Sequence, residues 1–325
     1  MMRVERLLAD CLDDARTEPL GSVPLTAQDD GYPAARRLFL AAGLEALRAH
    51  ARQDGWVQLD VPCPAPRPER RLYERLLGTA EELLASGRAG DFFFMHKPPG
   101  LRIRFRAADR SRVPELCEVL LGRLAPPRHG PAWERPVPRV YEPETYLFGG
   151  PRAMSFVHTL FTADSLAWLR VHTAAAGEPA PPAWRVSLML LRAVCDALGV
   201  VGWEHRGVWQ AVREETGRGL SRGLHSPDLR RAAAGIRRYW ESGREDRLDA
   251  LPKAWRDVME EHLRAVESAA RQWHTGCFAS GEATLGPRRA AARHAVFHWN
   301  RGGLSTARQC LLTEALAADG HQEVG

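Results

Sequence analysis

Cysteine is scarce and unpaired in this chain, and lysine is almost absent. The six cysteines among 325 residues are scattered between Cys11 and Cys310 without a Cys-x-x-Cys pair, which argues against a zinc site or a disulfide framework. Lysine occurs only at Lys97 and Lys253, so the positive charge behind the net +5 is almost entirely arginine. No long basic run contains interleaved aromatic residues, and we therefore expect no nucleic-acid partner.

Long apolar runs are also missing. No stretch is long enough to span a bilayer, and acidic residues interrupt the apolar N-terminal segment 1–16, which is atypical of a secretory signal. These absences predict a soluble, cytoplasmic protein. A hydrophobic content of 45% over 325 residues suffices for a full core, and we expect one domain over 1–325 whose residues 1–50 form a helical extension.

Motifs that hold common cofactors are absent as well. The chain has no phosphate-binding loop, no Gly-x-Gly-x-x-Gly dinucleotide fingerprint and no Gly-x-Ser-x-Gly nucleophile elbow. His294 and His298 are four residues apart on an expected helix, a spacing that can place two metal ligands on one face, but no third ligand is evident. We therefore expect neither a cofactor nor a metal ion.

Hydrophobic periodicity predicts an α+β fold, with an antiparallel sheet in the first half and a large helical part after Pro151. Alternation predicts a hairpin over 92–106 around a Pro-Pro-Gly turn, with Leu101, Ile103 and Phe105 on the core face and three arginines on the other. Further strands are expected at 55–61 and 137–141, and helices at 69–86, 113–124 and 288–299.

The segment 141–165 carries a dense group of polar residues and is divided by the turn Gly149-Gly150-Pro151. Glycine accepts unusual dihedral angles and proline suits a first helical position, so this turn predicts the start of a helix. The Asp164-Ser165 pair is expected to cap a second helix that begins near Leu166. The polar candidates of the segment are Tyr141, Glu142, Glu144, His158, Asp164 and Ser165.

Three motifs, taken in order, resemble a known family. They are the strand with Arg102 and Arg104, the Tyr-x-Pro-Glu stretch at 141–144 with its Phe-Gly-Gly turn and later Asp-Ser pair, and the His-Trp-Asn-Arg helix end at 298–301. Together they are similar to the C-terminal domain of lantibiotic dehydratases, also called the thiopeptide-type bacteriocin biosynthesis domain, from about residue 55 to residue 317. The resemblance implies the fold of the dehydratase elimination domain, and a ribosomally made peptide with an N-terminal leader as substrate.

The resemblance implies two reactions. In one, the domain eliminates glutamate from glutamylated Ser or Thr and leaves a dehydroamino acid. In the other, a stand-alone relative joins two dehydroalanines in a formal aza-Diels-Alder reaction, then loses water and the leader to give a pyridine and a macrocycle. Eliminating members resemble Pro-Glu-x-x-Arg-Tyr-Gly-Gly at the turn, where the arginine suits the glutamate carboxylate. This chain has Leu147 and Phe148 there, which favours the pyridine synthase; a non-catalytic leader-binding subunit is a third alternative.

Candidate residues follow from the positions that match the motifs. The catalytic candidates are Tyr141, Glu144, His158, Ser165 and His298, with Tyr141 or His298 expected to polarise the amide of the diene half. The substrate-binding candidates are Arg102, Arg104, Glu142, Phe148, Asp164, Trp299, Asn300 and Arg301. The expected partner is a leader-bearing precursor peptide with azoles and dehydroalanines, whose acidic leader would lie along the hairpin arginines. A homodimer is compatible with this interpretation.

Overall fold

The computed structural model describes residues 10–12, 36, 38–43, 55–63, 68–127, 133–174, 179–281 and 283–318. The chain divides into two compact units, Met1–Asp54 and Gly55–Gly325. The described residues of the first unit are helical. The single domain expected over 1–325, with its helical extension over 1–50, stays a prediction because most of that extension lies outside the described residues. None of the helices in the described part of the chain is long and apolar enough to cross a membrane.

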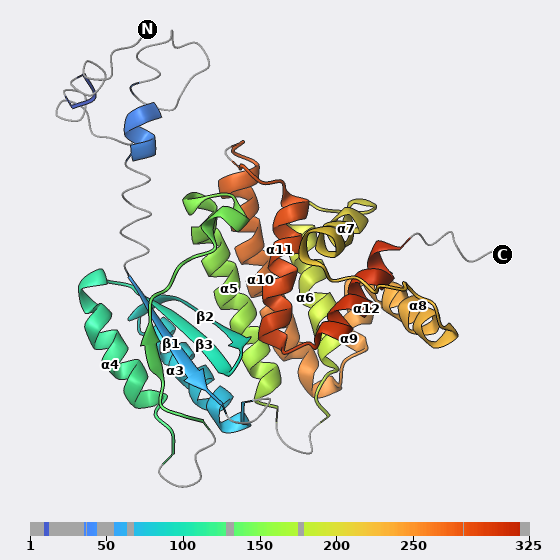
Figure 1. Ribbon diagram of the computed structural model, residues 1–325, viewed down its shortest axis with the longest axis horizontal. Coiled ribbons are helices and arrows are strands. Elements are labelled where there is room, and N and C mark those ends of the chain that lie inside the picture. Colours follow the sequence, from blue (N-terminus) through green and yellow to red (C-terminus); the bar gives the residue numbers. More distant parts are fainter. Residues whose placement is uncertain are drawn as a thin grey trace. The chain divides into compact units, whose positions relative to one another are not determined.

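An antiparallel sheet of four strands forms one layer of the second unit (Figure 1), in the order β2-β3-β1-β4. The strands are β1 (Trp56–Pro62), β2 (Ala89–Lys97), β3 (Gly100–Ala107) and β4 (Val137–Arg139). The hairpin of β2 and β3 is confirmed, and so is the α+β class. At the turn, a Cβ on Gly100 would lie 2.0 Å from the carbonyl oxygen of Val61, so only glycine allows β3 to start against β1.

Both faces of the sheet are covered. On one face, Ile103 lies in register with Leu59 and Phe94, and α3 (Arg70–Ala85) packs there through Tyr73, whose ring contacts Phe94. Helix α4 (Val113–Arg123) contacts β1 and β3. On the other face Arg104 lies in register with residues of both neighbouring strands and is only 2% exposed. The arginine face of the hairpin is therefore interior at its centre.

Helix α5 (Pro151–His172) lies along the edge strand β2, where His158 and Phe161 pack against Phe93 of the second face, and it is longer than predicted. The Asp164-Ser165 pair was expected to cap a second helix near Leu166, and that prediction is wrong because the helix continues through both residues. Their side chains bond across to other elements instead of back to their own backbone. The hydroxyl of Ser165 accepts from the N–H of Phe94 at 3.4 Å, and that of Thr162 accepts from Phe92. Helix α5 thus satisfies edge donors of β2 that a sheet edge otherwise exposes.

The strand predicted at 137–141 ends earlier, at Arg139. Tyr141 leaves the sheet ladder because its ring packs edge-on against Trp56, 5.0 Å between centroids, and against Phe93 at 5.8 Å. The chain then passes through the 3-10 turn η2 (Thr145–Phe148) and two glycines with positive φ, Gly149 and Gly150, into α5. The predicted turn is confirmed. Tyr141, which precedes it, packs on the sheet face that carries Phe93 and Arg104.

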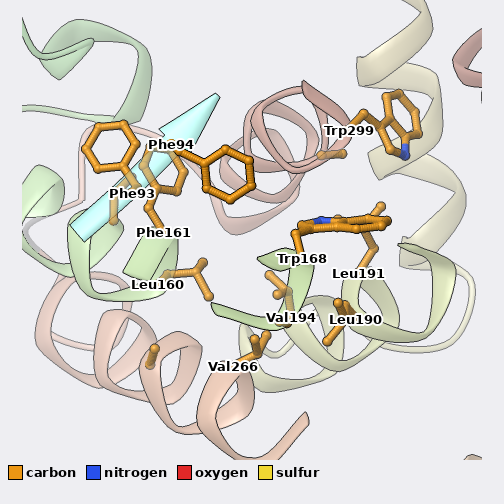
Figure 2. Close-up of a cluster of buried hydrophobic side chains, with 14 of the residues drawn as sticks. Phe93, Phe94, Leu160, Phe161, Trp168, Leu190, Leu191, Val194, Val266 and Trp299 are labelled. Carbon is orange, nitrogen blue, oxygen red and sulfur yellow. The ribbon is translucent and has the colours of Figure 1, made fainter. Parts of the chain in front are cut away.

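Seven further α-helices lie in the described part of the chain after α5. They are α6 (Ala183–Ala197), α7 (Glu204–Thr216), α8 (Pro227–Glu241), α9 (Arg244–Asp249), α10 (Lys253–Trp273), α11 (Pro287–Gly302) and α12 (Thr306–Ala317). Figure 2 shows how the core continues from the sheet into these helices. Phe93 and Phe94 of β2 lie near Phe161 of α5, and Trp168 of α5 lies near Trp299 of α11.

The end of α11 is shaped by two adjacent glycines. A Cβ on Gly302 would lie 2.5 Å from the indole of Trp168, so a side chain has no room there. Gly303 has a φ of +62°, the left-handed conformation that commonly ends a helix. The Arg-Gly-Gly sequence therefore allows α11 to approach α5 closely and to end at Gly302.

Candidate active site

A buried pair, Tyr141 and His158, forms the first part of the candidate site. The hydroxyl of Tyr141 lies 2.8 Å from Nε2 of His158 on α5. Burial, together with the positive charges of Arg106 and Arg104, lowers the pKa of His158 to about 3. Burial also raises the pKa of Tyr141, and the charge of Glu144 adds to that rise. Both groups are therefore neutral near pH 7, with the hydroxyl donating to the imidazole.

Arg104 places a buried positive charge against this pair. Its guanidinium carbon lies 4.7 Å from the ring centroid of Tyr141 and 4.9 Å from that of Phe93, within cation–π range. Its Nε donates to Oε1 of Gln58 at 2.7 Å, whereas its buried Nη1 has no partner among the described residues. Burial lowers the pKa of Arg104, and the nearby charge of Glu144 opposes that shift. Because an unpaired buried donor costs free energy, Nη1 is a group that a ligand could satisfy.

Glu144 supplies an acceptor beside this donor. It directly precedes η2, and its Oε2 is buried without a hydrogen-bond partner in the described part of the chain. Its charge acts on Arg104, Tyr141 and also Arg301, which places Glu144 close to both parts of the site. A peptide bond offers one C=O and one N–H, so the unpaired donor of Arg104 and the unpaired acceptor of Glu144 are the two groups that an amide could satisfy.

The second part of the site is a buried network around Asp164. Its Oδ1 accepts from Nδ1 of His298 at 2.7 Å, and its Oδ2 accepts from Nε of Arg301 at 2.6 Å. On the other side of the imidazole, Nε2 of His298 lies 3.0 Å from Oγ of Ser187, which also accepts from Nε1 of Trp299 at 3.0 Å. Burial alone would raise the pKa of Asp164, but His298 and Arg301 outweigh burial and hold it well below its usual range.

Ser187, His298 and Asp164 have the hydrogen-bond order of a serine nucleophile triad, yet their surroundings indicate another role. All three are 0% exposed, and Ser187 is held by Trp299 as well as by His298. Nε1 of Trp168 also lies 3.1 Å from Nδ1 of His298, but a nitrogen that donates to Asp164 cannot accept, so this contact is packing. We infer that His298 positions Arg301 and the end of α11 instead of contacting substrate.

Arg301 and His294 leave further polar atoms unpaired. Arg301 is 0% exposed, its guanidinium carbon lies 4.3 Å from the ring centroid of Phe161, and its Nη1 and Nη2 have no partner in the described part of the chain. Both ring nitrogens of His294 are likewise unpaired there. Burial lowers the pKa of His294 to about 3, so its ring is neutral near pH 7. The two NH2 groups of Arg301, at Nη1 and Nη2, are the charged donors of this part of the site.

Asp164, His294 and His298 bring three possible metal ligands within 4.8 Å of one another. Asp164 is the third ligand that the spacing of the two histidines did not reveal. One carboxylate and two imidazoles could hold a divalent ion. However, Asp164 already accepts from the buried guanidinium of Arg301, whose positive charge would repel a cation in a medium of low dielectric. The residues present therefore fit an ion-paired network better than a metal ion.

One face of α5 joins the two parts of the site. His158, Phe161, Ser165 and Trp168 follow one another at three- and four-residue spacing, which aligns them along a helix. The ring of Phe161 lies 5.2 Å from that of Phe93, and the guanidinium of Arg301 packs over the same ring. Phe161 therefore contacts side chains of both parts of the site, and Figure 2 shows its ring next to Phe93 and Phe94.

The structure brings most of the predicted residues together. The first part of the site contains Tyr141, Glu144, His158 and Arg104, and the second contains Asp164, His298, Trp299 and Arg301. Phe148 lies next to them, with its ring 5.7 Å from Phe161, and is 1% exposed.

Four predicted residues are placed differently. Glu142 is exposed. Arg102 forms an ion pair with Asp60, with Nε 3.0 Å from Oδ1, and so does not offer a free guanidinium at the centre of the site. The hydroxyl of Ser165 accepts from the backbone N–H of Phe94 at the edge of the sheet. Asn300 contributes its backbone carbonyl, which accepts from Nδ1 of His96 at 2.7 Å.

Sequence reasoning missed Ser187 and Gln58. Ser187 stands alone among apolar residues in the buried run Val186–Leu191, and a lone hydroxyl in such a run signals a bonded core group. Gln58 alternates with apolar residues in β1 and is 4% exposed. Its partner Arg104 is 46 residues away in sequence, so only the strand register connects the two.

The two buried histidines predict an acid-sensitive fold. The pKa values of His158 and His294 fall from 6.5 to about 3, so between those values the unfolded chain binds more protons than the folded one. Stability should therefore be complete above pH 6.5 and decline as the pH falls toward 3. We expect the denaturant midpoint to drop between pH ~7 and ~4, and His294→Leu to flatten that dependence. Exposed His225→Leu is the matched control; an equal slope in both variants would contradict the assignment.

The architecture defines a class of protein: an α+β domain whose antiparallel sheet packs on a helical layer around a buried Tyr-His pair and an Asp-His-Arg network. Comparison with known proteins agrees. The sequence model described as "Lantibiotic biosynthesis dehydratase C-term" matches residues 56–319. The chain belongs to this family, which confirms the resemblance seen in its motifs and supports a role in the biosynthesis of ribosomally made, modified peptides.

Solved structures extend this result to the fold. The tRNA dependent lantibiotic dehydratase MibB from Microbispora sp. 107891 superimposes with a TM-score of 0.55 at 21% sequence identity, covering 81% of this chain and 28% of that chain. At this identity the likeness shows the fold alone. The chain thus corresponds to little more than a quarter of the length of MibB. No curated protein matches the chain.

Proposed function

We propose that this protein is a pyridine synthase of thiopeptide biosynthesis. It would act in the cytoplasm on a leader-bearing precursor peptide that already contains azoles and two dehydroalanines. A formal aza-Diels-Alder cycloaddition joins the alkene of one dehydroalanine to the azadiene that the other dehydroalanine forms with its preceding amide. Loss of the amide oxygen as water and of the leader as a carboxamide then gives the pyridine and closes the macrocycle. The observation that carries this proposal is the neutral Tyr141–His158 pair beside an unpaired donor and acceptor.

The reacting groups of this cycloaddition are uncharged. Holding the two partners close supplies up to about 7–11 kcal/mol of the barrier in well-oriented systems, and the remaining need is to shift an amide to its iminol form. That shift moves a proton from nitrogen to oxygen. A neutral phenol that donates and a neutral imidazole that accepts are suited to it near pH 7, and Nη1 of Arg104 with Oε2 of Glu144 would orient the amide.

The turn before α5 also suits an uncharged substrate. Leu147 is half-buried, and Phe148 packs against Phe161, Trp273 and Phe297. The guanidinium that eliminating relatives would place at residue 147 is thus replaced by apolar surface, which matches azole and dehydroalanine side chains better than a leaving carboxylate.

Glutamate elimination is the second candidate, and a specific observation favours it. Arg104 and Arg301 both have buried N–H groups without a partner in the described part of the chain, and two guanidinium groups could bind a glutamate carboxylate in place of the missing one. On this alternative the protein is a stand-alone elimination subunit of a split dehydratase. A non-catalytic leader-binding subunit is not favoured, because unpaired buried polar atoms cost stability that a scaffold need not give up.

Mass spectrometry separates the candidates. The purified protein is incubated without added cofactor with a leader-bearing azole peptide that holds two dehydroalanines, and separately with a glutamylated precursor. Pyridine absorbance with release of the leader as a carboxamide is the expected result. Loss of glutamate from the second substrate, with the first unchanged, would establish elimination and overturn the proposal.

A further inference from the structure

A groove with an apolar floor lies between α6, α8 and α12, and none of the residues that line it belongs to the candidate active site. It encloses about 510 Å³. Its floor is formed by Trp184 of α6, Ile236 and Tyr239 of α8, and Leu311 and Leu312 of α12. The rings of Trp184 and Tyr239 lie 5.3 Å apart in edge-on contact. Figure 1 shows α8 and α12 next to one another at the C-terminal side of the helical layer.

Four arginines surround this floor, and no acidic residue is among the described residues that line it. Arg238 and Arg308 are exposed, and neither has a side-chain partner in the described structure. Arg231 is paired with Asp228 at the outer edge. Arg185 lies over Trp184 at 5.3 Å and over Tyr239 at 5.8 Å, and donates from Nη1 to a backbone carbonyl, while its buried Nε is unpaired.

Charge and shape together indicate what the groove accepts. Arginines around an apolar floor, with no carboxylate to neutralise them locally, attract a ligand of negative charge. The floor offers aromatic and aliphatic surface for at least one apolar side chain, the arrangement of a binding pocket with a charged rim. A nucleic acid needs an extended basic surface that follows its phosphates, whereas this charge is concentrated around one apolar depression.

We propose that this groove binds an acidic segment of the precursor peptide that carries an apolar anchor residue, in the part of the peptide that does not react. The assignment of the segment to the precursor rests on the proposed function. Helix α6 supports the connection, because Trp184 and Arg185 in the groove are three and two residues before Ser187, which bonds His298 in the candidate site. Roughly 5 Å of helix therefore separates the groove from the network.

The hairpin arginines, expected to lie along the leader, are less suited to this task. Arg102 is paired with Asp60, and Arg104 is buried against Tyr141. The groove, in contrast, has two exposed arginines beside an apolar floor, Arg238 and Arg308. The groove in the helical layer is therefore a better candidate for the leader-binding surface than the hairpin of the sheet.

Fluorescence anisotropy with a defined probe tests the groove. The probe is a short fluorescein-labelled glutamate-rich peptide with one phenylalanine, and its counterparts replace phenylalanine by alanine or glutamate by lysine. We expect the double variant Arg238→Glu with Arg308→Glu to weaken probe binding by about tenfold or more, and the alanine peptide to bind more weakly than the probe. The matched control reverses two exposed arginines elsewhere, Arg71 and Arg135.

Each outcome decides the proposal. Equal loss of binding in the groove and control variants would show a general charge effect and overturn it. Probe binding that does not depend on the phenylalanine, or bulk tRNA binding that the groove variant alone abolishes, would overturn the peptide assignment. Because the probe needs no catalysis, absent pyridine formation with intact groove-dependent binding would count against the proposed reaction only, and the reverse result against the groove only.

Discussion

Replacing Asp164 by asparagine should lower the free energy of unfolding by about 3–5 kcal/mol, the range for breaking a buried ion pair by removing one partner. The carboxylate is 0% exposed and is the acceptor for both His298 and Arg301. An amide of the same shape keeps the volume but not the charge, so the guanidinium of Arg301 remains buried without its counter-charge. Urea denaturation followed by circular dichroism measures the loss.

An exposed ion pair provides the control for that experiment. Glu82 on α3 pairs with Arg123 on α4, and both side chains are well exposed. Glu82→Gln removes a carboxylate from a pair of the same type, and we expect little change in the denaturation midpoint because water screens exposed pairs. If Asp164→Asn were as mild as Glu82→Gln, the aspartate network would not hold α5 against α11, and our account of these helices would be wrong.

The parts of the fold that could be predicted are those set by local pattern. Alternation along 101–106 identified the hairpin and its two faces, and the Gly149-Gly150-Pro151 turn identified the start of α5. The contacts of the arginine face could not be predicted, because its partners lie far away in the sequence. Arg104 is buried against Tyr141, which lies 37 residues later, and the partner of its Nε, Gln58, comes from a different strand.

The difference between local and distant partners also explains why the helix cap predicted at Asp164-Ser165 was wrong. Asp164 and Ser165 are residue types that cap helices when their side chains bond to nearby backbone N–H groups. In this chain the carboxylate bonds residues 134 and 137 positions away, and the hydroxyl bonds one 71 positions away. A local sequence window contains none of these partners. Ser187 was missed for the same reason, because its two partners lie on α11, more than 100 residues later.

The Tyr141–His158 pair should carry the largest effect on activity. Tyr141→Phe removes the hydroxyl that bonds the imidazole of His158 while keeping the ring against Trp56 and Arg104. We expect product formation to slow by about 10²–10⁴-fold, the usual contribution of a positioned acid or base. Glu144→Gln should have an effect in the same direction, because it neutralises the unpaired acceptor. Single-turnover mass spectrometry on the dehydroalanine peptide measures both rates.

The neighbouring residues offer matched controls in the same segment. Tyr146 is 84% exposed and Glu142 is exposed, so Tyr146→Phe and Glu142→Gln make the same chemical changes outside the buried pair. Both should retain the wild-type rate. Since a phenol with a raised pKa acts as a hydrogen-bond donor and not as a phenolate, the wild-type rate should also show no rise toward alkaline pH. A Tyr141→Phe variant as fast as Tyr146→Phe would remove the neutral pair from the mechanism, leaving the guanidinium groups of Arg104 and Arg301, and with them glutamate elimination, as the better reading.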